Sequence, residues 1–131
     1  MLVEYLQVDI TTYCNSHCGG CIRNKNGGEP VVDLTHLSVE TFKKIDFNNI
    51  KYVYFNGSYG DFTSHPNFFE ILDCIPKNVK VDGSTNGSAR TPDWWKQLAI
   101  KLKKFSWGRI TFAVDGLETN EIYRNSKIQT D

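Results

Sequence analysis

Four short apolar segments, each followed by a polar turn, recur along the chain with helix-forming sequence between them. They lie at 5–10, 51–55, 79–84 and 109–114. In the first, Leu6, Val8 and Ile10 alternate with polar residues, as in a strand with one buried face. The later steps of about thirty residues match successive β–α–β units, which form a parallel sheet with right-handed crossovers. The sequence therefore predicts an α/β fold.

Helices are predicted between these strands, over 39–46, 66–75 and 92–104, with a further short helix near Glu118. Ser38 can cap the first helix and Thr91 the third, because a hydroxyl at this position accepts a hydrogen bond from a free backbone N–H. Residues 11–37 form a long irregular stretch, and such stretches are usually functional or disordered.

The composition limits the classes of partner and location. The 131 residues are 40% hydrophobic, enough for one core, and 15 basic residues balance 15 acidic ones, so no nucleic-acid partner is indicated. The N-terminal segment lacks the basic start and apolar run of a signal peptide, and no stretch reaches the length of a membrane span. We therefore expect a cytoplasmic protein without a membrane partner.

Cys14, Cys18 and Cys21 form a C-x3-C-x2-C array directly after the first strand. Disulfides among them would close only tiny loops, so the spacing favours a metal centre. A structural zinc ion normally takes four protein ligands. The fourth cysteine, Cys74, falls in an apolar helix stripe, and His17 would strain to share a metal with its neighbour Cys18. Three ligands leave one coordination position open.

The other unusual motifs also follow predicted strands, and ligands of parallel α/β folds collect at the carboxyl ends of the strands. A glycine-punctuated turn over 56–61 follows the second strand. Its Gly57 and Gly60 lack side chains, so backbone groups could approach a small polar ligand closely. Ser84-Thr85-Asn86-Gly87 ends the third strand, and Val114-Asp115-Gly116 ends the fourth.

Taken in order, these motifs resemble those of the radical S-adenosylmethionine (radical SAM) superfamily. In that superfamily three cysteines after a first strand hold a [4Fe-4S] cluster, whose fourth iron binds the methionine part of S-adenosylmethionine (SAM). The 56–61 turn takes the place of the Gly-Gly-Glu-like motif that holds the methionine amino group, with Asp61 at the acidic position. Asn86 belongs to a Thr-Asn-Gly like the one that ends the third strand in many members. Asp115-Gly116 is similar to a segment of the branch that often carries a C-terminal auxiliary-cluster domain.

The resemblance implies a reaction and a set of site residues. Cys14, Cys18 and Cys21 would ligate the [4Fe-4S] cluster. The residues implied to bind SAM are Gly57, Ser58, Tyr59, Gly60, Asp61, Asn86 and Asp115. An electron from a donor such as flavodoxin or ferredoxin would cleave SAM reductively to a 5′-deoxyadenosyl radical, which abstracts hydrogen from a substrate. The sequence identifies neither the substrate nor a catalytic residue.

The chain also departs from the family pattern. Gly20 stands before the third cysteine, where an aromatic residue is common, and members usually complete further β/α units. We therefore expect residues 1–131 to form one domain, the N-terminal part of a radical SAM core. Its fold would be a partial (β/α) barrel, about the first two thirds, with four parallel strands and outer helices. Two alternatives remain: a non-enzymatic metal- or iron–sulfur-binding module, and a half-barrel that needs a partner chain.

Overall fold

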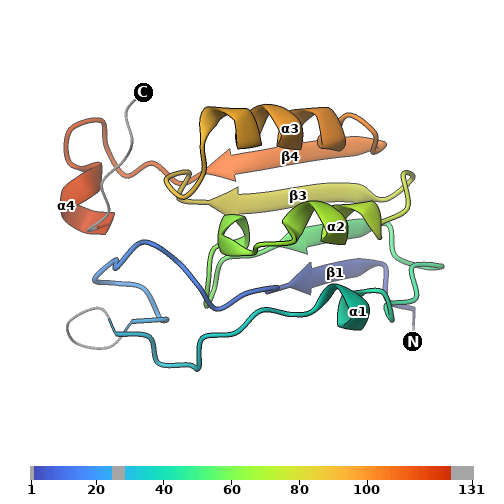
Figure 1. Cartoon of the computed structure of the whole chain (residues 1–131), viewed down its shortest axis with the longest axis horizontal. Helices are drawn as coiled ribbons and strands as arrows, with labels where there is room; N and C mark the ends of the chain where they lie inside the picture. The colour runs from blue at the N-terminus through green and yellow to red at the C-terminus, as the bar shows by residue number, and fades with distance from the viewer. Residues whose placement is uncertain (1, 25–28, 125–131) are drawn as a thin grey trace.

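The strands predicted from the sequence form one parallel sheet in the computed structural model, which describes residues 2–24 and 29–124. In chain order they are β1 (Tyr5–Val8), β2 (Tyr52–Phe55), β3 (Lys80–Thr85) and β4 (Trp107–Phe112). Each strand pairs in parallel with the next, in the order β1-β2-β3-β4. All four arrows in Figure 1 point to the same side, so the carboxyl ends of the strands gather at one edge. The predicted α/β fold is confirmed, and the open sheet is consistent with a partial (β/α) barrel.

Helical segments connect the strands. They are α1 (Val39–Phe42), the 3₁₀ turn η1 (Phe62–Ser64), α2 (Phe68–Asp73), α3 (Pro92–Leu102) and α4 (Asn120–Arg124). Thr91 caps α3 as predicted, since its side chain accepts a hydrogen bond from the backbone N–H of Trp94 at 3.4 Å. Ser38 caps α1 in the same way, through the backbone N–H of Thr41 at 3.1 Å.

Three helices are shorter than the sequence predicted, and α3 differs least, because it ends at Leu102 instead of residue 104. Helix α1 ends at Phe42 instead of residue 46, because the N–H groups of Lys44 and Ile45 bond to carbonyls three residues back and close tight turns. Helix α2 begins at Phe68 instead of residue 66, because Asn67 has a φ of −106° and a ψ of 32°, which is not helical. The predictions of 39–46 and 66–75 were therefore too long at these ends.

The core lies between the sheet and helices α1, α2 and α3. Val53, Phe55 and Val81 from the sheet are fully buried. The helical side chains that are buried with them are Phe42, Phe68, Ile71, Leu72 and Leu98. Cys74 packs against this cluster, and its Sγ lies 3.2 Å from the carbonyl oxygen of Glu70, to which it donates. Cys74 was predicted within this helix; it is instead the C-cap residue, one position beyond α2, and it is half-buried against the core.

The described part of residues 11–37 is a loop closed at its base. Thr11 forms an antiparallel bridge with His36, and the N–H of Leu37 donates to the carbonyl of Ile10 at 2.8 Å. The hydroxyl of Thr12 donates to the carbonyl of Asp33 at 2.7 Å. The loop therefore leaves and rejoins the sheet at the carboxyl end of β1. Figure 1 shows α4 on the same side of the molecule as this loop.

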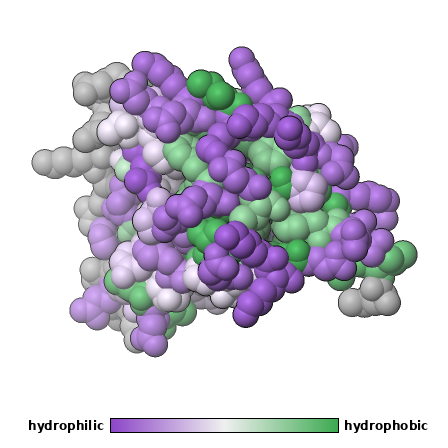
Figure 2. All heavy atoms as spheres, turned by 45° about the vertical axis from the view of Figure 1, so that its right-hand side comes forward, coloured by the Kyte–Doolittle hydropathy of each residue, from purple (hydrophilic) through white to green (hydrophobic). Residues whose placement is uncertain are grey.

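The surface shown in Figure 2 is a mosaic in which apolar side chains (green) lie between polar ones (purple). Within residues 2–24 and 29–124, none of the helices has the length and apolar character that a membrane crossing requires.

Candidate metal and cofactor site

A cavity of about 210 Å³ lies at the carboxyl ends of the strands, and all three cysteines of the array line it. The 56–61 turn contributes Asn56, Gly57, Ser58, Gly60 and Asp61. The end of β3 contributes Ser84, Thr85 and Asn86. Three segments that are far apart in sequence thus meet at one place, as expected for a parallel sheet.

Two of the residues proposed for SAM binding lie outside this lining. Asp115 lines a neighbouring, more open cavity of about 770 Å³ together with His17 and Tyr123. Tyr59 is 36% exposed and lines neither cavity. The sequence placed both correctly in turns after strands, but the positions of single side chains within a turn depend on tertiary contacts.

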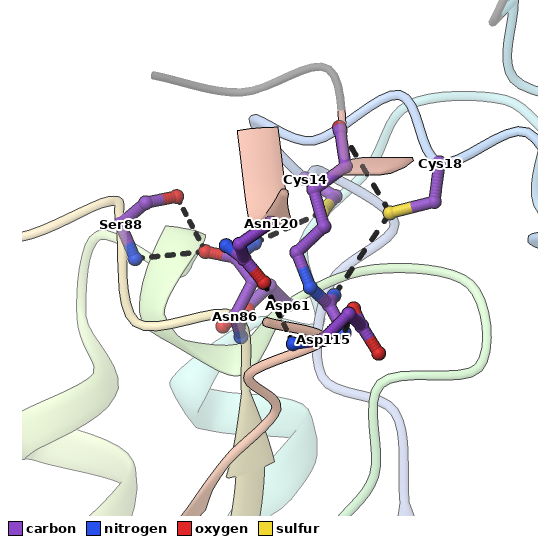
Figure 3. A network of polar contacts seen from close by, with 8 residues as sticks. Cys14, Cys18, Asp61, Asn86, Ser88, Asp115 and Asn120 are labelled. Atoms are coloured by element: carbon purple, nitrogen blue, oxygen red, sulfur yellow. Dashed lines mark hydrogen bonds and ion pairs between the residues drawn. The ribbon is translucent and has the colours of Figure 1, made fainter. Parts of the chain in front are cut away.

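Asp61 is buried at 3% exposure, and its carboxylate is fully engaged with the protein. It accepts hydrogen bonds from the backbone N–H and hydroxyl of Thr63, at 3.0 and 2.6 Å. It also accepts from the hydroxyl of Thr85, at 2.8 and 2.9 Å, and from the backbone N–H of Asn86 at 2.8 Å. This carboxylate therefore ties the turn after β2 to the end of β3 (Figure 3).

Gly60 is required by the chain's own packing. A Cβ on this residue would lie 2.1 Å from the carbonyl oxygen of Thr11 and 2.8 Å from that of Tyr13. The N–H of Asp61 donates to the same carbonyl of Tyr13 at 2.8 Å. The 56–61 turn is thus pressed against the segment that leads into Cys14. The sequence indicated a close backbone approach here, and at Gly60 the structure shows that the approaching group is protein backbone.

Burial is the main influence on two of the three thiols. It raises the pKa of Cys14, and the nearby Asp61 carboxylate raises it further, while Arg23 acts in the opposite direction. Burial likewise raises the pKa of Cys18, against a lowering effect of Arg124. Metal binding to these thiols must therefore release protons.

Hydrogen bonds also reach the sulfur atoms. The side-chain amide of Asn86 donates to the Sγ of Cys14 at 3.5 Å, and the backbone N–H of Ser16 donates to it at 3.4 Å. The Nη1 of Arg124 donates to the Sγ of Cys18 at 3.9 Å, while the other terminal nitrogen, Nη2, forms an ion pair with Asp115 at 2.5 Å. Figure 3 shows Cys14, Asn86, Cys18 and Asp115 close together.

Two buried polar atoms in the described residues lack a hydrogen-bond partner: Ser16 Oγ and Arg124 Nε. Both residues line the cysteine cavity. An unpartnered buried polar group costs free energy, so these two atoms are polar groups beside the cavity whose hydrogen-bonding capacity the protein itself leaves unused. The same cavity is lined by Ser16, by Arg124 and by the three cysteines. This set of residues fits an iron–sulfur cluster, because the ligands of such a cluster are thiolates.

The described residues contain no group of three or more His, Cys, Asp or Glu side chains placed to hold a single metal ion. A cluster makes a different demand, because each thiolate binds a different iron and the sulfur atoms surround the group instead of converging on one point. His17 lines the neighbouring cavity, and its backbone N–H donates to the carbonyl of Arg124 at 3.0 Å. It was predicted not to be a ligand.

Sequence reasoning missed Arg23, Arg124 and Ser16 as parts of this site. Arg23 is 4% exposed, lines the cavity and donates from Nε to the carbonyl of Thr12 at 3.0 Å. The sequence signal for Arg23 is its position two residues after Cys21, whereas its burial is visible only in the structure. Arg124 follows the Asp115-Gly116 segment that the sequence marked, but its approach to Cys18 depends on the fold.

Comparison with known proteins gives a relative for most of the chain. Over 101 residues the chain is 32% identical to the tungsten-containing aldehyde ferredoxin oxidoreductase cofactor-modifying protein of Pyrococcus furiosus. The matched region is 74% of this chain and 28% of the relative, so the chain spans little more than a quarter of that protein. No family model matches the chain, and no solved structure matches it.

Proposed function

The chain is homologous to part of a radical SAM protein, and from this premise we propose that it forms the cluster- and cofactor-binding part of a radical SAM enzyme. The observation that carries the proposal is the meeting of Cys14, Cys18 and Cys21 with two strand ends at one cavity. A [4Fe-4S] cluster held by these cysteines would, with SAM bound, supply the electron for reductive cleavage of SAM to methionine and a 5′-deoxyadenosyl radical.

The protein's own part is ligation, orientation and shielding. Cys14, Cys18 and Cys21 would hold the cluster, and Asn86 would keep its hydrogen bond to the sulfur of Cys14. Asp61 would act by fixing the two strand ends, because its carboxylate already accepts bonds from Thr63, Thr85 and Asn86.

The SAM-binding part of the proposal rests on the turn after β2. Gly57 and Ser58 line the cavity together with Asn86. Tyr59 and Asp115 would be reached only by a ligand that extends beyond the cavity, as SAM with its adenosine would. The electron donor is proposed to be a flavodoxin or ferredoxin, and the substrate is undefined.

The test is anaerobic reconstitution with iron and sulfide, followed by measurement of bound iron and of the visible absorption of the cluster. We expect alanine substitution of Cys14, Cys18 or Cys21 to abolish cluster binding, because each thiolate holds one iron. Cys74→Ala is the matched control and should retain the wild-type iron content, since Cys74 lies against the core at the far side of the sheet.

Equal loss of iron in Cys74→Ala would overturn the three-cysteine assignment. The same preparations should be tested for 5′-deoxyadenosine after reduction in the presence of SAM. A protein that binds iron through the three cysteines and never releases 5′-deoxyadenosine would instead be a non-enzymatic iron–sulfur module.

A half-barrel completed by another chain is a second candidate. It is favoured by the free edge of β4, which has no strand beside it among the described residues. In that case residues of the other chain would complete the site, and the proposed roles of the three cysteines would stay the same.

A further inference from the structure

We propose that Arg23 and Arg124 set the reduction potential of the bound cluster, with the hydroxyl of Ser16 as an added hydrogen-bond donor. This inference rests on the proposed function and extends it to how electron transfer into the site is tuned. The two guanidinium groups come from opposite ends of the chain, and both line the cysteine cavity.

The first observation is the pairing of each buried thiol with its own arginine. The charge of Arg23 acts on Cys14, and that of Arg124 acts on Cys18 at a Nη1–Sγ distance of 3.9 Å. Both side chains are largely shielded from water, with Arg23 4% exposed and the side chain of Arg124 14% exposed. Salt screens such groups little, so their charges act at nearly full strength.

The second observation is that the two unpartnered buried polar atoms of the described residues, Arg124 Nε and Ser16 Oγ, both belong to this lining. Arg124 uses Nη2 for its ion pair with Asp115 and its backbone carbonyl for the N–H of His17. Its Nε is buried and has no hydrogen-bond partner among the described residues. Hydrogen bonds to the sulfurs and local charge are two of the factors that fix a cluster's potential.

The sign of the effect follows from electrostatics. Reduction adds one negative charge to the cluster, and a nearby positive charge stabilises the reduced form more than the oxidised form. Arg23 and Arg124 should therefore raise the potential and make the cluster easier to reduce. Asp115 limits this effect by pairing with Arg124, because it places a negative charge beside that guanidinium.

The test measures the midpoint potential of the reconstituted cluster by spectroelectrochemistry in wild type, R23Q, R124Q and the matched R23K and R124K. Both glutamine variants should have more negative potentials, and the lysine variants should fall between them and wild type. K96Q, which changes an exposed lysine on α3, should leave the potential unchanged. Bound iron is measured in each sample.

The outcomes separate this inference from the function beneath it. If the wild-type protein fails to bind iron, the proposed function itself is wrong. Full iron content with unchanged potentials in both glutamine variants would overturn the inference alone. A loss of affinity for SAM in R124Q at an unchanged potential would also overturn it, because Arg124 would then bind the cofactor. If R124Q loses iron, a potential of R124K at or slightly below the wild-type value supports a role of charge, and loss of iron in R124K rejects it.

Discussion

Gly60 shows at the scale of one residue how the chain's own packing shapes the site. It has no left-handed backbone requirement, since the described glycines with positive φ are Gly87 and Gly116. Its constraint is steric, because the neighbouring carbonyl oxygen of Thr11 occupies the space that a side chain would need. Backbone atoms cannot move aside as the end of a flexible side chain can.

Gly60→Ala should therefore destabilise the protein by about 1–3 kcal/mol, the usual range for overpacking. It should also lower the iron content after reconstitution, because Thr11 and Tyr13 lead directly into Cys14. Urea unfolding monitored by circular dichroism measures the first effect. Gly19→Ala is the control, since nothing lies within 4 Å of a Cβ at that position in the cysteine loop. Similar midpoints for the two variants would contradict the steric argument.

A polar network links β2, β3 and β4 on the face of the sheet that is turned away from the helices. Asp82 is buried and accepts hydrogen bonds from the hydroxyl of Tyr52 at 2.7 Å and from Nη2 of Arg109 at 2.5 Å. Burial alone would raise the pKa of Asp82, but the bonds from Arg109 and Tyr52 outweigh it and lower that pKa. Burial and the bond to Asp82 raise the pKa of Tyr52 to about 12.

These two pKa shifts limit the pH range over which the network stabilises the folded state. The folded-state pKa of Asp82 is lowered, so its contribution is present above the ordinary carboxyl range and is lost as the pH falls through the lowered value. The pKa of Tyr52 is raised from 10.0, so its contribution is present below pH 10 and is lost as the pH rises towards 12.

We expect the difference in unfolding free energy between wild type and Tyr52→Phe to shrink from pH 9.5 to pH 11.5, because only the wild type loses stability through Tyr52 over that range. Chemical denaturation at the two pH values measures it. Tyr59→Phe, at an exposed position, should show no such change in its difference from wild type. An equal difference for Tyr52→Phe at both pH values would contradict the assignment.

The strands and α3 were predictable because their signals are local. Strand β2 is an aromatic and β-branched run, and α3 has a threonine cap, a first-turn proline and an apolar stripe. The short helices α1 and α2 were overestimated, because tight turns and the backbone of Asn67 end them before the apolar pattern does.

The sequence could predict the part of the site that follows from the order of the strands. A parallel sheet brings all strand ends to one edge, so the meeting of the cysteine loop with Asn86 followed from the strand order. The engagement of Asp61 with Thr85 and the approach of Arg124 to Cys18 depend on hydrogen bonds between distant residues. No local pattern in the sequence marks such bonds.

At the scale of the whole molecule, the sheet formed by the described residues does not close. Within residues 2–24 and 29–124, β4 is paired only with β3, and apolar side chains at and after its end are exposed, among them Phe112 at 50% and Val114 at 61%. A free edge beside apolar side chains is a template for association with another chain. We therefore expect the chain to fold and either to self-associate or to need further polypeptide beside β4.

Light scattering at increasing protein concentration should therefore show oligomers, and Val114→Lys should reduce them by adding a charge beside the free edge. Leu34→Lys is the matched control, because Leu34 is 46% exposed in the segment between β1 and α1, and β1 is the strand at the opposite edge of the sheet. It should leave the association unchanged. A wild-type chain that stays monomeric at all concentrations would show that the open edge is not adhesive.

The contact between Cys18 and Arg124 spans 106 positions of the chain, and the contact between Cys14 and Asn86 spans 72. Contacts of such separation form late in folding, because a long loop must close before they are made. Because the cysteines are translated before α4, Cys18 lacks its contact with Arg124 until residue 124 has been added. We therefore expect the thiols to be more accessible to iron and sulfide before α4 is in place than after it.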